Sequence, residues 1–205
     1  MFDLPTDLPA DLAPLSWLVG VWEGTGVIDY ADHSFSGEFL HRVSFSHDGG
    51  DYLNYSASAW LTDADDAAAA GEQPSSLLVA EVGYWRLSRP ATDADAGPGL
   101  LPPAAPPIRR TADDVEQLRN ADGGFDIEVV LVHADGVSEL YLGQIKGPRI
   151  DIATDAVVRP ASAKTYAAAS RMYGLVEGHL LWAWDMAALG EDLAAHASAR
   201  LARVE

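Results

Sequence analysis

The 205-residue chain contains no cysteine. Without thiols there is no disulfide, no zinc–thiolate or iron–sulfur centre and no thiol catalysis. Any metal or metal-bearing cofactor must then be held by histidine or carboxylate side chains. The six histidines are therefore the first residues to consider.

Basic residues are also scarce, with 13 Lys and Arg against 31 Asp and Glu and a net charge of −18. Binding to nucleic acid or to an anionic membrane needs a positively charged surface. We expect neither partner, and interpret the acidity as a contribution to solubility. A small-molecule ligand fits this composition, and the sequence leaves a homodimer open.

Long apolar runs are missing: no stretch approaches the roughly 18 residues of a membrane span. The start of the chain, residues 1–5, lacks the basic and apolar regions of a signal peptide. We therefore expect a cytoplasmic protein. Its length, 48% hydrophobic content and six tryptophans predict one domain over residues 1–205.

Common catalytic motifs are absent as well. There is no Gly-x-Ser-x-Gly elbow, no P-loop and no Gly-x-Gly-x-x-Gly, because Gly24–Gly26 continues into the strand-like Val27 and Ile28. Serine-hydrolase and nucleotide-binding functions are therefore not supported. A hydrolase with paired carboxylates stays open, since such pairing cannot be read from sequence.

What the chain does have is period-two alternation interrupted by turn residues. This pattern predicts an all-β fold, an antiparallel up-and-down β-barrel of about ten strands. The clearest hairpins join 41–45 to 52–60, 125–133 to 137–144, and 164–174 to 179–186, with a further strand at 150–154.

The heptapeptide Gly20–Gly26, GVWEGTG, is the most informative motif. Glycines weaken an ordinary strand, but in a closed barrel they allow a bend and a close backbone approach. We expect Trp22 to fill the closed end. A barrel filled at one end encloses a ligand at the other.

Two segments interrupt the alternation, at about 63–76 and 89–124. Both are expected to be surface loops. The second is proline-rich at 89–112, where a solvated extension is favoured over a polyproline-type partner ligand, and residues 113–119 are expected to add one or two helical turns.

Two short helices are expected, near the N-terminus at Leu12–Leu18 and at the C-terminus at Asp192–Val204. In the second, Leu193, Ala197 and Leu201 share one face by i, i+4 spacing. His196 would then lie at the edge of that face.

Five of the histidines, His33, His41, His47, His133 and His179, lie beside turns or in polar alternation and are interpreted as solvated. His196 differs because alanines surround it, which lets a flat, bulky group approach the ring. Local spacing alone still favours a surface histidine over a ligand.

Several motifs, in order, resemble the nitrobindin family, also described as fatty-acid-binding-protein-like. Leu15-x-x-Leu18 precedes the glycine motif, and Ala80–Arg86 is similar to the family's Ala-Glu-x-Gly-Tyr/Phe-x-Arg strand. Further matches are Ile127–Val129 with Gly136-x-x-Glu139, Ala163-Lys164 with Arg171, and Asp185–Ala188 with Leu193-x-x-His196 and Leu201.

The resemblance implies a ten-stranded barrel with haem b at its open end and His196 as the single axial ligand. Lys164 would be a weaker candidate for contact with the haem or its propionates. Family members bind nitric oxide and isomerise peroxynitrite to nitrate in the ferric state, and a lone imidazole leaves one axial position open for this.

The chain departs from the family in two places. Leu77–Glu81 has no histidine where members often carry one facing the open side of the haem, so the distal side is expected to be apolar. Asp29–His33 replaces a Tyr-Pro-Thr run. Two other functions remain: a carrier of fatty acid or another apolar ligand, and a haem-based nitric oxide sensor acting through a separate partner.

Overall fold

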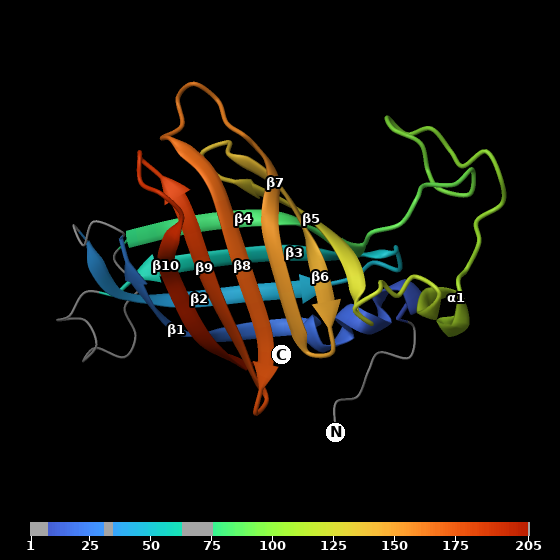
Figure 1. The fold of residues 1–205 in the computed structure, drawn as a ribbon, viewed down its shortest axis with the longest axis horizontal. Helices are drawn as coiled ribbons and strands as arrows, with labels where there is room; N and C mark the ends of the chain where they lie inside the picture. The colour runs from blue at the N-terminus through green and yellow to red at the C-terminus, as the bar shows by residue number, and fades with distance from the viewer. Residues whose placement is uncertain (1–7, 31–34, 63–75, 205) are drawn as a thin grey trace.

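The computed structural model describes residues 8–30, 35–62 and 76–204. In this part of the chain ten antiparallel strands close into a barrel, in the order β1-β10-β9-β8-β7-β6-β5-β4-β3-β2 (Figure 1). Each strand pairs with its sequence neighbours, and β10 closes the ring against β1. The expected up-and-down barrel is confirmed.

The elements follow the predicted turns closely, because a side-chain period of two and local turn residues determine antiparallel hairpins. Their bounds are η1 Ala10–Leu18, β1 Gly20–Asp29, β2 Ser36–Ser46, β3 Tyr52–Leu61, β4 Ser76–Leu87, α1 Ala112–Glu116, β5 Phe125–His133, β6 Ser138–Lys146, β7 Arg149–Val158, β8 Tyr166–Val176, β9 His179–Ala188 and β10 Ala194–Arg203.

The expected C-terminal helix is wrong: Ala194–Arg203 forms strand β10. A spacing of four is also a multiple of two, so Ala197 and Leu201 share one face of a strand as readily as one face of a helix. Pairing with both β1 and β9 overrides the helix propensity of the alanines. The N-terminal helix is confirmed as the 3₁₀ helix η1.

One end of the barrel is filled by η1 and the start of β1. Leu12, Leu15 and Leu18 are fully buried there together with Trp22, whose indole N–H donates to the Leu18 carbonyl at 2.7 Å. The expected position of Trp22 is confirmed. We call this the closed end.

The glycine motif has the predicted steric role. A Cβ at Gly24 would lie 2.2 Å from the Arg200 carbonyl oxygen, and one at Gly26 would lie 2.5 Å from that of Ser198. Strands β1 and β10 can therefore approach closely only because these positions lack side chains.

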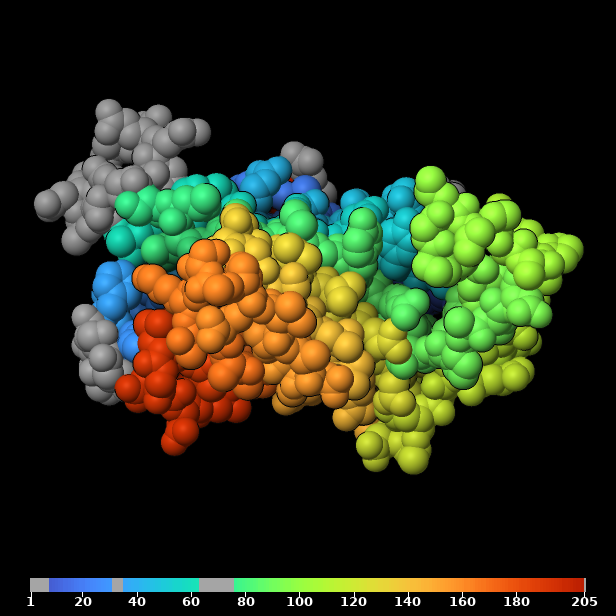
Figure 2. All heavy atoms as spheres, turned by 90° about the horizontal axis from the view of Figure 1, so that it is seen from above, coloured from blue at the N-terminus to red at the C-terminus, as the bar shows by residue number. Residues whose placement is uncertain are grey.

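The long segment between β4 and β5 covers the closed end. Its helix α1 begins with a capping box between Thr111 and Asp114 and buries Val115, and Arg110 pairs with Asp11 of η1 at 2.8 Å. In Figure 2 the segment forms a lobe at one end of the molecule, opposite the C-terminal strands. The other expected loop, 63–76, lies outside the described residues except for Ser76, which begins β4.

None of the helices in the described residues is long and apolar enough to cross a membrane.

Candidate functional site

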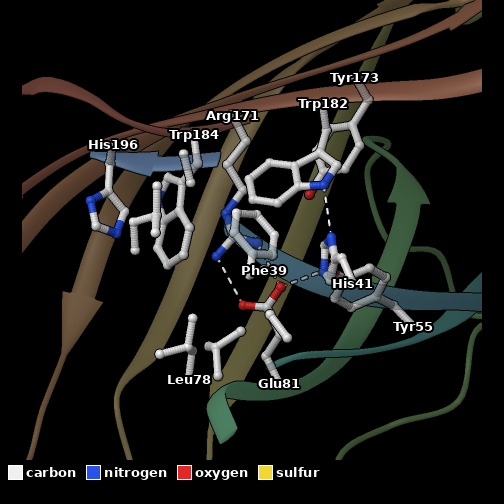
Figure 3. Close-up of a pocket in the computed structure, with 14 residues that line it drawn as sticks. Phe39, His41, Tyr55, Leu78, Glu81, Arg171, Tyr173, Trp182, Trp184 and His196 are labelled. Atoms are coloured by element: carbon white, nitrogen blue, oxygen red, sulfur yellow. Dashed lines mark hydrogen bonds and ion pairs between the residues drawn. The ribbon is translucent and has the colours of Figure 1, made fainter. Parts of the chain in front are cut away.

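A cavity of about 130 Å³ opens at the end of the barrel opposite η1, which we call the open end. Most of its wall is apolar or aromatic, including Phe39, Leu78, Trp182 and Trp184, and His196 is part of the lining (Figure 3).

Two β-bulges shape this cavity. The pairing of β10 with β9 shifts between Ala195 and Ala197, and both His196 and Ala197 line the cavity. Consecutive residues of a regular strand face opposite sides, so the bulge is what turns the imidazole inward. A second shift, opposite β3, lets Leu78 and Val79 of β4 both face the cavity.

Ring contacts hold the half-buried His196. Its imidazole packs edge-on against Trp184 at 5.4 Å and Tyr30 at 6.0 Å between ring centroids. Nδ1 is enclosed and has no hydrogen-bond partner among the described residues, so Nε2 is the nitrogen left to meet a ligand. Burial lowers the pKa of His196, which favours the neutral ring that a metal requires.

His41 was expected to be solvated, and this prediction is wrong. It is 6% exposed on β2 and lines the cavity. The indole N–H of Trp182 donates to its Nδ1 at 2.8 Å. Burial lowers the pKa of His41 to about 4, so the ring is neutral at pH 7. Alternation placed the side chain correctly on one face of β2 but could not say that this face is the interior.

The floor of the cavity is polar. Glu81 of β4 is buried and binds Arg171 of β8 through two hydrogen bonds of 2.7 and 2.9 Å, and Tyr55 donates to the same carboxylate at 2.6 Å. Burial would raise the pKa of Glu81, but the Arg171 charge and hydrogen bonds outweigh it and lower the pKa to about 2. Sequence motifs marked both residues, but not their pairing.

The pair continues into a second buried carboxylate. Arg171 Nε donates to the Tyr141 hydroxyl at 3.1 Å, and Tyr141 and Tyr166 donate to Glu139 at 2.6 and 2.5 Å. His133 Nε2 lies 2.6 Å from the other Glu139 oxygen. The expectation of a solvated His133 is therefore wrong too.

Of the other three histidines, His47 and His179 are half-buried, and His33 lies outside the described residues.

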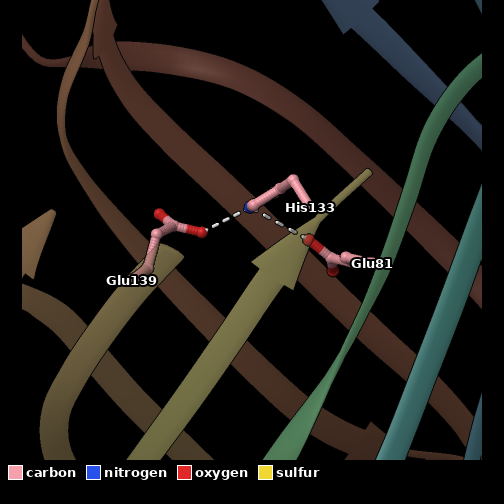
Figure 4. Close-up of side chains that lie close together, drawn as sticks. All are labelled: Glu81, His133 and Glu139. Atoms are coloured by element: carbon pink, nitrogen blue, oxygen red, sulfur yellow. Dashed lines mark hydrogen bonds and ion pairs between the residues drawn. The ribbon is translucent and has the colours of Figure 1, made fainter. Parts of the chain in front are cut away.

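Glu81, His133 and Glu139 stand close enough to suggest a metal site (Figure 4). The two carboxylates, however, already accept hydrogen bonds from Arg171, His133 and tyrosines, and Arg171 Nη2 lies 3.6 Å from Glu139. A guanidinium beside them repels a cation and supplies the compensating charge. The donor set fits a hydrogen-bonded ion network better than a metal centre.

Lys164 is exposed in the loop before β8, and it borders a neighbouring hollow with His133, Tyr166 and Trp184. It does not line the cavity that contains His196. Trp184 forms part of both walls.

The cavity fits haem by its own chemistry. A planar, largely apolar macrocycle matches the aromatic and aliphatic walls, and the neutral His196 offers one nitrogen to iron. Leu78 and Val79, from the stretch Leu77–Glu81, give the cavity an apolar wall, and His41 adds a polar group that the sequence did not reveal.

Fold and site together define a class: a closed antiparallel barrel with a ligand cavity at one end and an inward-facing histidine on its last strand. The chain belongs to the family of the THAP4-like, heme-binding beta-barrel domain, whose model matches residues 11–203. The resemblance stated from the sequence motifs is thereby confirmed.

Known proteins of similar sequence match this chain over its full length. A peroxynitrite isomerase of Leifsonia xyli subsp. xyli is 61% identical over 208 residues, and one of Clavibacter michiganensis subsp. michiganensis is 58% identical over 207, each covering 100% of both chains. The crystal structure of Rv2717c from M. tuberculosis superposes with a TM-score of 0.64 at 25% identity, covering 99% of this chain and 100% of that one.

Proposed function

We propose that this protein binds haem b in the open-end cavity and isomerises peroxynitrite to nitrate, with His196 as the axial ligand. The observation that carries the proposal is the orientation of His196, turned into an apolar cavity by a bulge with only Nε2 free. Full-length relatives named peroxynitrite isomerase support the reaction, and the family supports the cofactor.

Different residues of the cavity have different roles in the proposed reaction. His196 would hold the iron, while the apolar Leu78 and Val79 would exclude water and offer no nitrogen ligand from β4. When bound, ferric haem supplies a Lewis-acidic centre with an open coordination position for the substrate. Isomerisation of peroxynitrite to nitrate rearranges the atoms of one anion, so the chain need not supply a reductant.

The composition is consistent with the b type. Covalent attachment through thioether bonds needs cysteine, and the chain has none. The haem is then retained by His196, by apolar packing and by contacts to its propionates. Lys164 is assigned a propionate contact from the rim, in keeping with its exposed position next to the Trp184 wall.

Peroxynitrite decay followed by stopped flow tests the function. Ferric protein should accelerate decay beyond free haem, with nitrate as the product, whereas apoprotein and His196→Ala should not. Equal decay in all three protein samples would remove the enzymatic role and favour carriage of an apolar ligand.

The same open position should bind nitric oxide, which we include in the proposed function. Titration of the ferrous protein with nitric oxide, followed by the Soret band, measures it. A protein that binds nitric oxide tightly but accelerates peroxynitrite decay no more than free haem would act as a nitric oxide sensor or store instead.

Lys164→Met provides a separate test of the rim. It should weaken haem retention several-fold and leave the Soret maximum unchanged, because the axial ligand is untouched. The matched control is Lys146→Met, an exposed lysine at the end of β6 near the closed end.

A further inference from the structure

We propose that His41 donates a hydrogen bond from Nε2 to the ligand held in the open-end cavity, and so is a second functional histidine. The inference rests on the haem-binding part of the proposed function and adds a residue to it. The ligand class is a small anion or another hydrogen-bond acceptor bound opposite His196.

The tautomer of His41 is determined by its neighbour. Indole nitrogen is a donor only, so the 2.8 Å contact from Trp182 makes His41 Nδ1 the acceptor. A neutral imidazole has one N–H, which must then be on Nε2. The lowered pKa of His41 is consistent with this neutral form.

The Nε2 N–H of His41 is available to donate a hydrogen bond to a ligand. Among the described residues no hydrogen bond is made to His41 Nε2, and the atom is not enclosed as His196 Nδ1 is. The positions paired with His41 across the sheet are Gly24 and Ala59, so neither neighbouring strand places a large side chain directly beside the ring.

The nitrogen donors of Arg171 and Trp184 at the cavity are engaged or closed off. Arg171 directs three nitrogens to Glu81 and Tyr141. The Trp184 indole nitrogen has no partner in the described part of the chain, but it is enclosed and does not reach the cavity. Among these nitrogen donors, His41 is thus the one best placed to meet a ligand.

The two histidines also lie far apart in the lining. Figure 3 shows His196 at one end and His41 at the other, with Trp184 and Arg171 between them. A ligand held in the cavity beyond His196 would therefore extend toward His41.

Infrared spectroscopy of the ferrous carbon monoxide complex tests this geometry, because a hydrogen bond to bound carbon monoxide lowers its C–O stretching frequency. We expect a higher frequency in His41→Leu than in the wild type and recovery in His41→Gln, which restores an N–H donor. Phe39→Leu, a change in the same wall without a donor, should leave the frequency close to that of the wild type.

Azide affinity of the ferric protein gives an independent measurement. It should fall about tenfold in His41→Leu and recover in His41→Gln, since a hydrogen bond to a charged group contributes about that much. If His41→Leu does not fold, Trp182→Phe replaces it: loss of the indole donor frees the tautomer, and the C–O band should broaden or split.

Each of the following results would overturn a different part of the proposal. An unchanged C–O stretch in His41→Leu with peroxynitrite isomerisation intact would overturn the role of His41 alone. A six-coordinate low-spin ferric spectrum that disappears in His41→Leu would make His41 an iron ligand rather than a donor. Failure of the wild type to bind haem would overturn the proposed function and this role together.

Discussion

The two ends of the barrel are built from similar residues for different purposes. At the closed end Trp22 is fully buried and its indole N–H is bonded to the Leu18 carbonyl. At the open end His41 and His196 line a cavity, and the Nε2 of each has no hydrogen-bond partner among the described residues. The closed end bonds the one polar group of its central side chain, and the open end leaves two imidazole nitrogens available to a ligand.

The largest expected effect on folding belongs to the network between the two ends. Arg171→Met should lower the free energy of unfolding by about 3–5 kcal/mol, because Glu81 and Glu139 would be left buried without their cation. Urea unfolding of the apoprotein measures it. The control is Arg86→Met, which removes an exposed arginine paired with Glu128 and should lower the free energy of unfolding by less than about 1 kcal/mol. If both variants lost the same stability, the buried ion pair would contribute no more than the exposed one.

Trp22→Ala tests how much the packing of the closed end contributes to stability. The loss of a fully buried indole and of its hydrogen bond should also cost about 3–5 kcal/mol, at the lower part of this range if η1 moves inward. Haem should still bind, since Trp22 does not line the cavity. An unchanged free energy of unfolding would show that Trp22 is not a main contributor to the stability of the barrel.

Acid should destabilise the open end first. Unfolded His41 takes up a proton near its ordinary pKa of 6.5, but folded His41 does so only near pH 4. Between these values the unfolded state holds more protons, so the free energy of unfolding falls as the pH drops, by about 3 kcal/mol in all. His41→Gln should flatten this part of the stability curve, and His196 acts in the same direction.

The smallest effect on folding should come from the residue most important for function. His196→Ala removes a half-buried ring with an unpartnered nitrogen, so the apoprotein should change by less than about 1 kcal/mol. Haem reconstitution should nevertheless fail to give the wild-type Soret band. A large loss of apoprotein stability would show that His196 also supports the fold.

The sequence predicts the closed end better than the open end. Trp22, the glycine motif and the hairpins depend on local spacing and turn residues, which are visible along the chain. The sequence of β10 favours a helix, because its alanines have high helix propensity and its apolar spacing of four suits both periods. Only pairing with β1 and β9, far away in sequence, decides between them.

The polar side of the site was missed for a related reason. His41 and His133 sit in alternating strands, and alternation does not tell which face is inside until the barrel closes. Glu81 and Arg171 are 90 residues apart, so their ion pair is a product of topology. His196 and Lys164 were named through the resemblance, and the structure adds the bulge that turns His196 inward.

That bulge makes the site sensitive to the number of residues in β10 as well as to their identity. Deleting Ala195 would restore regular pairing with β9 while leaving every functional side chain in the sequence. On a two-residue period, the imidazole would then alternate with Ala197 and point out of the barrel. Substitution scans of this strand would never sample that failure, whereas a scan of single-residue insertions and deletions would find it.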